Sequence, residues 1–374
     1  MPEFLYIHIP FCARKCIYCD FLSIRFDERT SSDYADALCI ELELKKGLAG
    51  ELKTVFLGGG TPSILPEKDL GKIFKCIYDN YRIKPDAEIT IEANPGTVTK
   101  EKASFIASLG INRCSIGVQS FVDSELRAIG RIHTADEAMQ AVGMFRYAGI
   151  KNISVDLIYG VPGQTLNSWI SSVRTAISLG PKHISAYELT PEKGTPLIHL
   201  LDAGKLSMPP EDDTLVMYDS AAAILPGSGY EHYEISNYAQ PGYFCIHNLN
   251  YWNRGEYIGA GAGAHSFIGG VRSANTRDLP EYVRRLKEHL SPEEESTEIS
   301  GEDSLKEFVF LGLRKTEGIR LSDAAELGLD LRNASPELTA EGFTETTNSR
   351  FRLTSKGMKI SNTVVVRLLQ DLGL

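Results

Sequence analysis

Short apolar runs alternate with longer amphipathic segments over the first two thirds of the chain. The apolar runs, which we predict to be strands, lie at residues 5–9, 54–60, 88–94, 113–119, 152–160, 183–189 and 232–236. The segments between them have helical character and lie at residues 33–48, 66–81, 100–109, 134–148, 167–179 and 210–225. Several begin at a capping residue or a proline, such as Thr99, Thr134, Pro66 and Pro210. This repeated alternation predicts a parallel sheet with crossover helices, and its regular spacing favours an open, incomplete (β/α)6 barrel over a flat doubly wound sheet.

Residues of unusual chemistry fall at the carboxyl ends of these predicted strands. A cysteine cluster follows the first run, and a glycine run ends the second. Polar residues end or lie within the others: Glu92, Gln119, Asp156, Tyr187 and Glu188. In parallel α/β folds the carboxyl ends of the strands open onto one face, where ligands bind. We therefore expect these residues to meet at one polar mouth.

The character of the chain changes after the seventh run. We predict three domains: the partial barrel at 1–240, a Gly- and aromatic-rich segment with an acidic linker at 241–300, and an α-rich domain at 301–374. In the last domain a strand-like stretch at 351–354 leads into a helix, which is typical of a winged helix. Winged helices often bind nucleic acid, but the acidic surroundings favour a packing role here.

Composition and charge narrow the class of protein. Of 374 residues, 43% are hydrophobic and 24% are charged, which is ordinary for a globular protein. The formal net charge of −10, without a basic cluster, argues against nucleic-acid binding. No apolar run approaches the ~20 residues of a membrane helix, and the start of the chain does not have the pattern of a signal peptide. The odd count of 7 cysteines favours reduced thiols and a cytoplasmic location over a disulfide framework.

Three of these cysteines, Cys12, Cys16 and Cys19, are clustered as C-x3-C-x2-C. These cysteines could form a structural zinc site, a redox-active pair in which the third cysteine takes no part, or an iron–sulfur site. A structural zinc ion usually has four protein ligands, and here only His8 or Cys39 could in principle supply the fourth. Three thiolates suit a [4Fe–4S] cluster in which one iron keeps an open coordination position.

This spacing after YIHIPF, with Tyr18 before the last cysteine, resembles the radical S-adenosylmethionine (SAM) superfamily. Members of that superfamily bind SAM at the open iron of a [4Fe–4S] cluster. The resemblance implies that Cys12, Cys16 and Cys19 hold the cluster. It also implies SAM contacts from Tyr6, Gly59, Gly60, Thr61, Glu92, Gln119, Arg131 and Asp156. Each of these has an ordinary interpretation as well, such as a structural carboxylate pair for Glu92 and Asp156, or a surface ion pair of Arg131 with Glu125.

A further set of motifs, YIHIPFC, GGGTPS, IEANPG, GVQSF and DLIYGVPGQT, resembles the oxygen-independent coproporphyrinogen oxidase group. Two departures argue against oxidase activity. Phe21 stands where the oxidase pattern has a further cysteine, and the chain starts only five residues before Tyr6. The stretch CIHNLNYW, residues 245–252, instead resembles the HNxxYW signature of the HemW family of haem chaperones.

That resemblance implies haem as bound cargo, with His247 as the axial ligand. An imidazole beside Trp and Tyr offers a nitrogen ligand and flat apolar surfaces to a macrocycle, although such a histidine is more often a packed, hydrogen-bonded residue. Cys245 is a second candidate ligand, and His265 a weaker third.

The first hypothesis is therefore a haem chaperone that delivers haem to haem-requiring apoproteins, some of them membrane-bound. The cluster and SAM would regulate its folding, dimerisation or release of haem, and whether it forms a homodimer stays open. The rival is a radical SAM enzyme of porphyrin biosynthesis that converts coproporphyrinogen III to protoporphyrinogen IX. A third is a radical enzyme acting on another substrate.

Overall fold

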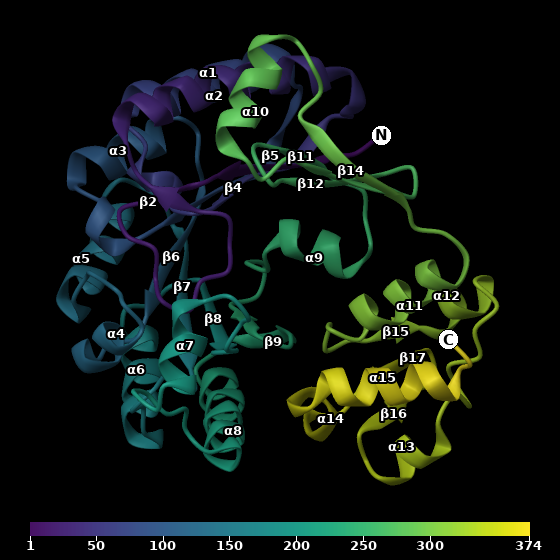
Figure 1. The fold of residues 1–374 in the computed structure, drawn as a ribbon. Coiled ribbons are helices and arrows are strands. Elements are labelled where there is room, and N and C mark those ends of the chain that lie inside the picture. The colour runs from purple at the N-terminus through teal and green to yellow at the C-terminus, as the bar shows by residue number, and fades with distance from the viewer.

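The computed structural model describes residues 1–374 and has a nine-stranded sheet at its centre (Figure 1). The order of strands in the sheet is β11-β1-β4-β5-β6-β7-β8-β10-β9. The six central strands run parallel to one another: β1 (Phe4–Ile9), β4 (Leu52–Gly59), β5 (Ile83–Ala93), β6 (Arg113–Gln119), β7 (Asn152–Tyr159) and β8 (His183–Glu188). The sheet is open, because β11 and β9 are edges that do not pair with each other. The predicted incomplete (β/α)6 arrangement is confirmed.

The crossover helices lie where the amphipathic segments predict them. They are α1 (Glu28–Lys45), α2 (Glu67–Asn80), α3 (Lys100–Ser108), α5 (Ala135–Tyr147), α6 (Leu166–Ser178) and α8 (Glu211–Gly227). Thr99 caps α3, and Thr134 forms a reciprocal capping box with Glu137 at the start of α5. The apolar strand residues pack with one face of these helices in a single core of 68 buried residues. Parallel strands that are buried on both faces consist of nearly continuous apolar residues, so the sequence alone predicts their positions.

The seventh apolar run forms a strand after the crossover helix α8, as predicted, and this strand has the same direction as β8, but the unpredicted antiparallel strand β10 separates the two. The strand is β9 (Glu231–Glu234), which pairs antiparallel with β10 (Asn237–Ala239) at the edge of the sheet. Only residues 235–236 separate the two strands, so the chain turns back in a hairpin and no crossover helix fits. The other edge strand, β11 (Ile258–Ala260), pairs parallel with β1 and was not predicted, because three residues carry too little pattern.

Residues 241–300 are more regular than a linker. They contain α9 (Ile246–Trp252), β12 (His265–Ile268), β13 (Val271–Asn275), α10 (Leu279–Lys287) and β14 (Glu293–Glu298). The acidic stretch forms β14, which pairs antiparallel with β13 and exposes every residue. Its carboxylates protect an exposed sheet edge from pairing with another chain, so here acidic composition marks an edge strand and not a linker.

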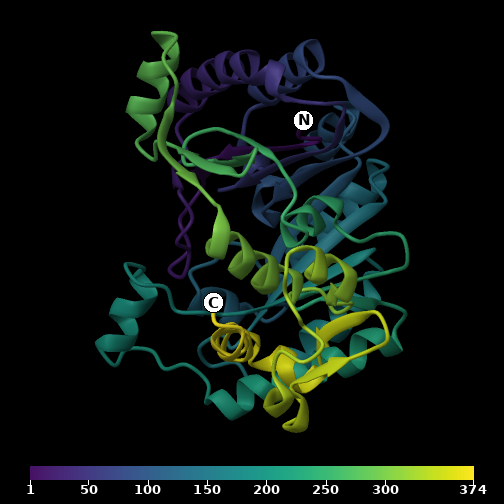
Figure 2. The same cartoon turned by 90° about the vertical axis from the view of Figure 1, so that its right-hand side faces the viewer.

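The C-terminal part combines short helices with the three-stranded antiparallel sheet β15-β17-β16, which agrees with the predicted winged-helix-like unit. Its elements are α11 (Gly301–Gly312), β15 (Ile319–Arg320), α12 (Leu321–Glu326), α13 (Pro336–Ala340), β16 (Thr344–Thr346), β17 (Arg350–Leu353), α14 (Ser355–Lys359) and α15 (Ser361–Asp371). Figure 2 shows the strand β14 leading directly into the helix α11, with which this unit begins. The helix α11 packs against α9. The domain boundaries that we predict at residues 240 and 300 stay predictions. None of the helices combines the length and the apolar character that crossing a membrane requires.

Candidate functional site

The carboxyl ends of the parallel strands open into a cavity of about 630 Å³. Its walls include all three clustered cysteines and every residue expected to contact SAM: Cys12, Cys16, Cys19, Tyr6, Gly59, Gly60, Thr61, Glu92, Gln119, Arg131 and Asp156. His247 also lines it, whereas the alternative haem ligands Cys245 and His265 do not. The structure therefore brings together residues that lie far apart in the sequence, from Tyr6 to His247.

Backbone pairing fixes both ends of the cysteine loop. The short strand β2 (Phe11–Cys12) pairs parallel with β3 (Ile24–Arg25), which closes the loop that carries Cys16 and Cys19. The glycine run holds the first end, because Gly60 and Thr61 donate backbone N–H groups to the carbonyls of Ile9 and Phe11. The Cys12 sulfur lies 3.5 Å from the Thr61 hydroxyl. The loop is thus attached to the ends of β1 and β4.

The loop offers three thiols on the wall of the cavity, as a [4Fe–4S] cluster with one open iron requires. No three His, Cys, Asp or Glu side chains converge closely enough to hold one ion. Each thiolate of a [4Fe–4S] cluster binds a different iron, so cluster binding does not require the sulfurs to meet at a point. Burial raises the pKa of Cys12, and that of Cys19 to about 11, so metal binding must displace protons from these thiols.

Arg131 connects the loop to the strand ends. Its Nη1 donates to the Cys16 sulfur at 3.5 Å, and its Nη2 donates to Asn94 Oδ1 at 2.6 Å and to the carbonyl of Gly117. The expected alternative, an ion pair with Glu125, does not form, because Glu125 accepts hydrogen bonds from Ser120, Ser168 and Gln164 instead. Arg131 places positive charge beside the thiolates.

Two carboxylates give the opposite wall a negative charge. Glu92 accepts a hydrogen bond from the backbone N–H of Gly59 at 3.0 Å. Burial and the neighbouring Asp156 raise the pKa of Glu92 to about 7. Asp156 accepts hydrogen bonds from three serine hydroxyls, those of Ser115, Ser154 and Ser185, at 2.7–2.9 Å. Neither carboxylate contacts a cationic side chain, so this wall fits a positively charged ligand group such as the ammonium of SAM.

The glycines at 59 and 60 are needed for the packing of the chain, in addition to their expected role in SAM binding. Gly59 has φ of +107°, a conformation that favours glycine, and a Cβ on Gly60 would lie 2.7 Å from the carbonyl oxygen of Phe11. These glycines are therefore required for close packing of β4 against the loop. The same bare backbone also lines the cavity, where a ligand can approach it closely.

His247 lies at the edge of this cavity with both ring nitrogens hydrogen-bonded. Nδ1 is 2.6 Å from the Thr54 hydroxyl, and Nε2 is 2.9 Å from the Tyr251 hydroxyl. Burial, aided by nearby Arg113, lowers the pKa of His247 to about 3, so the ring is neutral. A neutral imidazole can bind iron, but here only after one of its two partners moves.

The start of α9 is held by Glu88, a residue that no pattern in the sequence distinguishes. Its carboxylate accepts the backbone N–H of His247 at 3.2 Å and the Cys245 thiol at 3.7 Å, and it faces the buried Arg113 at 3.9 Å. Cys245 is thereby completely buried, whereas His265 is exposed on β12.

Sequence reasoning also missed Asn94, Ser115 and Ser185, which hold Arg131 and Asp156 in place. Asn94 directly follows β5, whereas Ser115 and Ser185 lie within β6 and β8, in register with Glu92 and Asp156 on the neighbouring strands. Asn94 could be found from its place at a strand end, but the two serines could be found only from the pairing of the strands.

Comparison with known proteins agrees with this geometry. Residues 6–176 match the radical SAM superfamily, and residues 299–360 match the HemN C-terminal domain. A Bacillus subtilis protein described as heme chaperone HemW is 37% identical over 98% of this chain and 99% of its own length. A Synechocystis protein of the same description is 40% identical over 85% of this chain and 79% of its own. Among solved structures, the coproporphyrinogen III oxidase HemN from Escherichia coli has a TM-score of 0.83 at 22% identity, over 99% of this chain and 90% of that one, which shows a shared fold.

Proposed function

The chain belongs to the HemW family of haem chaperones within the radical SAM superfamily, and from that premise we propose that it binds haem and delivers it to haem-requiring apoproteins. The observation that carries the proposal is the place of the HNxxYW helix, α9, whose His247 lies in the wall of the same cavity as the clustered cysteines. Relatives with this description align over nearly the whole chain, including both matched domains.

This chain has residues suited to bind a [4Fe–4S] cluster and SAM, the cofactors of the radical SAM superfamily. A [4Fe–4S] cluster, when bound, supplies an open iron and a transferable electron. Cys12, Cys16 and Cys19 would hold it, with Arg131 balancing their charge. Glu92 and Asp156 would bind the cationic part of SAM, and the backbone at Gly59 and Gly60 would receive its methionine portion. Tyr6, Thr61 and Gln119 line the remaining wall.

His247 is the proposed axial ligand of haem. His247 lines the cavity although only 1% of it is exposed, whereas Cys245 does not line the cavity and donates its thiol to Glu88. His265 is accessible but stands apart on β12, outside the cavity. Ligation through Nε2 of His247 requires that the Tyr251 hydroxyl moves away from this nitrogen.

Oxidation of coproporphyrinogen III is the second candidate, favoured by the shared fold with HemN. Phe21 argues against it, since the position expected to carry a fourth cysteine is an apolar ring that is 62% exposed beside the cavity. A phenyl ring cannot replace a thiol as ligand or acid.

The proposal includes a cytoplasmic location, because clustered thiols persist in a reducing compartment. The haem acceptors would include membrane-bound proteins, and a homodimer is one expected form of the chaperone.

The test is an anaerobic haemin titration of the cluster-reconstituted protein, followed by Soret absorption, beside His247→Ala. The control is His289→Asn, a histidine near the end of α10 and outside the cavity. Stoichiometric binding that weakens at least tenfold in His247→Ala supports a chaperone with His247 as ligand. Equal binding in both variants would move the ligand to His265 or Cys245. Absence of binding, together with turnover of coproporphyrinogen, would establish the oxidase instead.

A further inference from the structure

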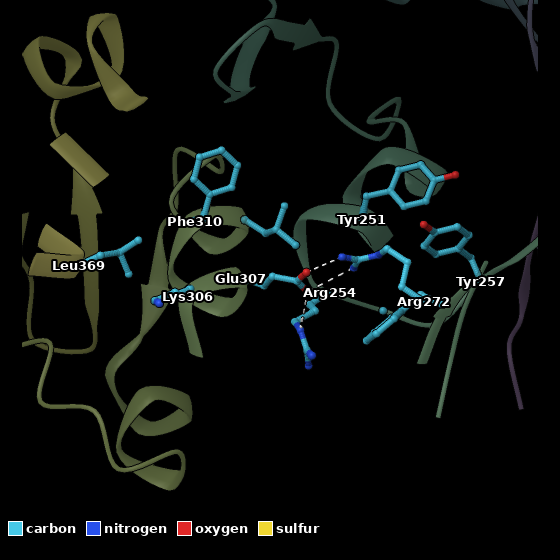
Figure 3. A pocket seen from close by; sticks show the side chains of 11 residues that line it. Tyr251, Arg254, Tyr257, Arg272, Lys306, Glu307, Phe310 and Leu369 are labelled. Carbon is cyan, nitrogen blue, oxygen red and sulfur yellow. Dashed lines mark hydrogen bonds and ion pairs between the residues drawn. The ribbon is translucent and has the colours of Figure 1, made fainter. Parts of the chain in front are cut away.

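A second cavity of about 630 Å³ lies between the HNxxYW segment and the C-terminal unit (Figure 3). Tyr251, Tyr257 and Phe267 form one wall, from α9 and the β12–β13 sheet region. Phe310, Leu311 and Leu369 form the facing wall, from α11 and α15. This volume lies in the ~300–1,000 Å³ range of sites that bury small organic ligands. The walls are largely apolar and aromatic, which suits a flat aromatic ligand.

Cationic side chains stand at this cavity in an otherwise acidic protein. Arg254, Arg272 and Lys306 line it, with Glu307 as the only carboxylate among the lining residues. The chain as a whole carries a formal net charge of −10, so a local excess of positive charge is not a property of its average surface. Such an excess favours a ligand with more than one acidic group.

Glu307 holds the two guanidiniums in position. It accepts from Arg254 Nε at 3.1 Å and from Arg272 Nη2 at 3.2 Å, with a second bond from Arg272 Nη1 (Figure 3). Both guanidiniums also lie over the Phe267 ring, 4.9 and 5.1 Å from its centroid. Each keeps further N–H donors, so the pair forms a fixed fork for carboxylates beside an aromatic wall.

We propose that this cavity is the docking site of haem. The macrocycle would lie between the two apolar walls, and its propionates would pair with Arg254, Arg272 and Lys306. This inference rests on the proposed function and adds to it the place and the residues that recognise the cargo.

Tyr251 connects this cavity to the one that holds the cysteines. It is the one residue that lines both, and its hydroxyl is bound to His247 Nε2. Rotation of the Tyr251 side chain would free the imidazole and remove a shared wall between the two cavities. Haem docked beside Tyr251 would then be adjacent to its proposed axial ligand, with the cofactor site behind it.

The test uses the cluster-reconstituted full-length protein and the variant Arg254→Gln/Arg272→Gln. The matched control is Arg284→Gln/Arg285→Gln, which removes two arginines that also share one carboxylate, Glu281, on α10. Haemin and haemin dimethyl ester, whose propionates carry no charge, are titrated into each. We expect the pocket variant to bind haemin at least tenfold more weakly than wild type and the control to bind it equally. The ester should not distinguish the variants.

If the double variant fails to fold, Lys306→Glu at the rim of the cavity is compared with Lys287→Glu on α10, both being lysines in surface ion pairs. Unchanged haemin affinity in the pocket variants, with haemin still bound by wild type, would overturn the pocket and leave the chaperone function intact. The same holds if the ester loses affinity in parallel with haemin. Absence of haemin binding to wild type would overturn both.

Discussion

The hydroxyl of Tyr251 lies 2.9 Å from Nε2 of His247, one helical turn away on α9. Nε2 is therefore covered by a residue of the same HNxxYW motif. The two side chains also meet edge to face, with ring centroids 5.1 Å apart. Haem ligation through Nε2 of His247 and this hydrogen bond exclude each other.

Tyr251→Phe is accordingly expected to strengthen haem binding. The substitution removes the competing hydrogen bond, worth about 1 kcal/mol, and keeps the aromatic wall, so affinity should rise about fivefold. Soret titration of the variant measures this. Tyr78→Phe, which deletes an exposed phenol that donates to the carbonyl of Leu109, is the control. Unchanged or weaker binding would mean that the phenol itself contacts haem.

A second prediction concerns the pH dependence of SAM binding. Because the pKa of Glu92 is raised to about 7, the carboxylate is only partly ionised at neutral pH. A cationic ligand group requires the ionised form, so SAM affinity should fall as pH decreases from 8 to 6. Calorimetric titration over this range should show the fall in wild type and weaker, pH-independent binding in Glu92→Gln. Parallel pH profiles would place the titrating group elsewhere.

The same carboxyl group has a consequence for stability without ligand. Its pKa is raised in the folded state from 4.5 to about 7, so between these values the folded protein binds the proton more tightly than the unfolded chain. Glu92 therefore destabilises the fold progressively as pH rises through this window. Glu92→Gln should gain up to about 3 kcal/mol relative to wild type at pH 8 and nothing below pH ~4.5. Thermal unfolding at both pH values checks this, and an equal difference at both would contradict it.

Gly60→Ala should disturb the cysteine loop. The added Cβ would lie 2.7–2.9 Å from backbone atoms of Ile9 and Phe11, which cannot yield as a flexible side chain does. Overpacking of this kind costs about 1–3 kcal/mol, so the melting temperature and the iron content after reconstitution should both fall. Gly47→Ala, where nothing lies within 4 Å, should change neither. A Gly60→Ala variant with full iron content would show that the loop adapts.

The parts of the site that the sequence revealed are those on long parallel strands. Polar residues in the apolar runs identify Glu92 near the end of β5 and Asp156 within β7, since the carboxyl ends of parallel strands meet at one edge of the sheet. The cysteine positions follow from their spacing alone. The motif resemblance then gave these residues their proposed roles, which composition and periodicity could not have supplied.

What the sequence could not reveal depends on contacts between distant segments. Glu88 meets His247 across 159 positions, and Arg254 meets Glu307 across 53. The strands β10 and β11, with three residues each, are too short to have a readable period. The acidic composition of β14 predicts a linker, because charge on an exposed edge strand cannot be distinguished from charge in a loop by sequence alone.

A final prediction tests how Glu88 positions α9. This buried carboxylate faces Arg113, of which 2% is exposed, and accepts the backbone N–H of His247. Glu88→Ala would leave Arg113 buried without its partner and should destabilise the protein by about 3–5 kcal/mol. Glu88→Leu/Arg113→Met removes both charges and should recover most of that loss. Chemical denaturation gives the stabilities and Soret titration the haem affinity of each variant. We expect the double variant to be stable but still weaker in haem binding, because the N–H groups at the start of α9 have lost their acceptor. Full recovery of both properties would show that Glu88 serves only to neutralise Arg113.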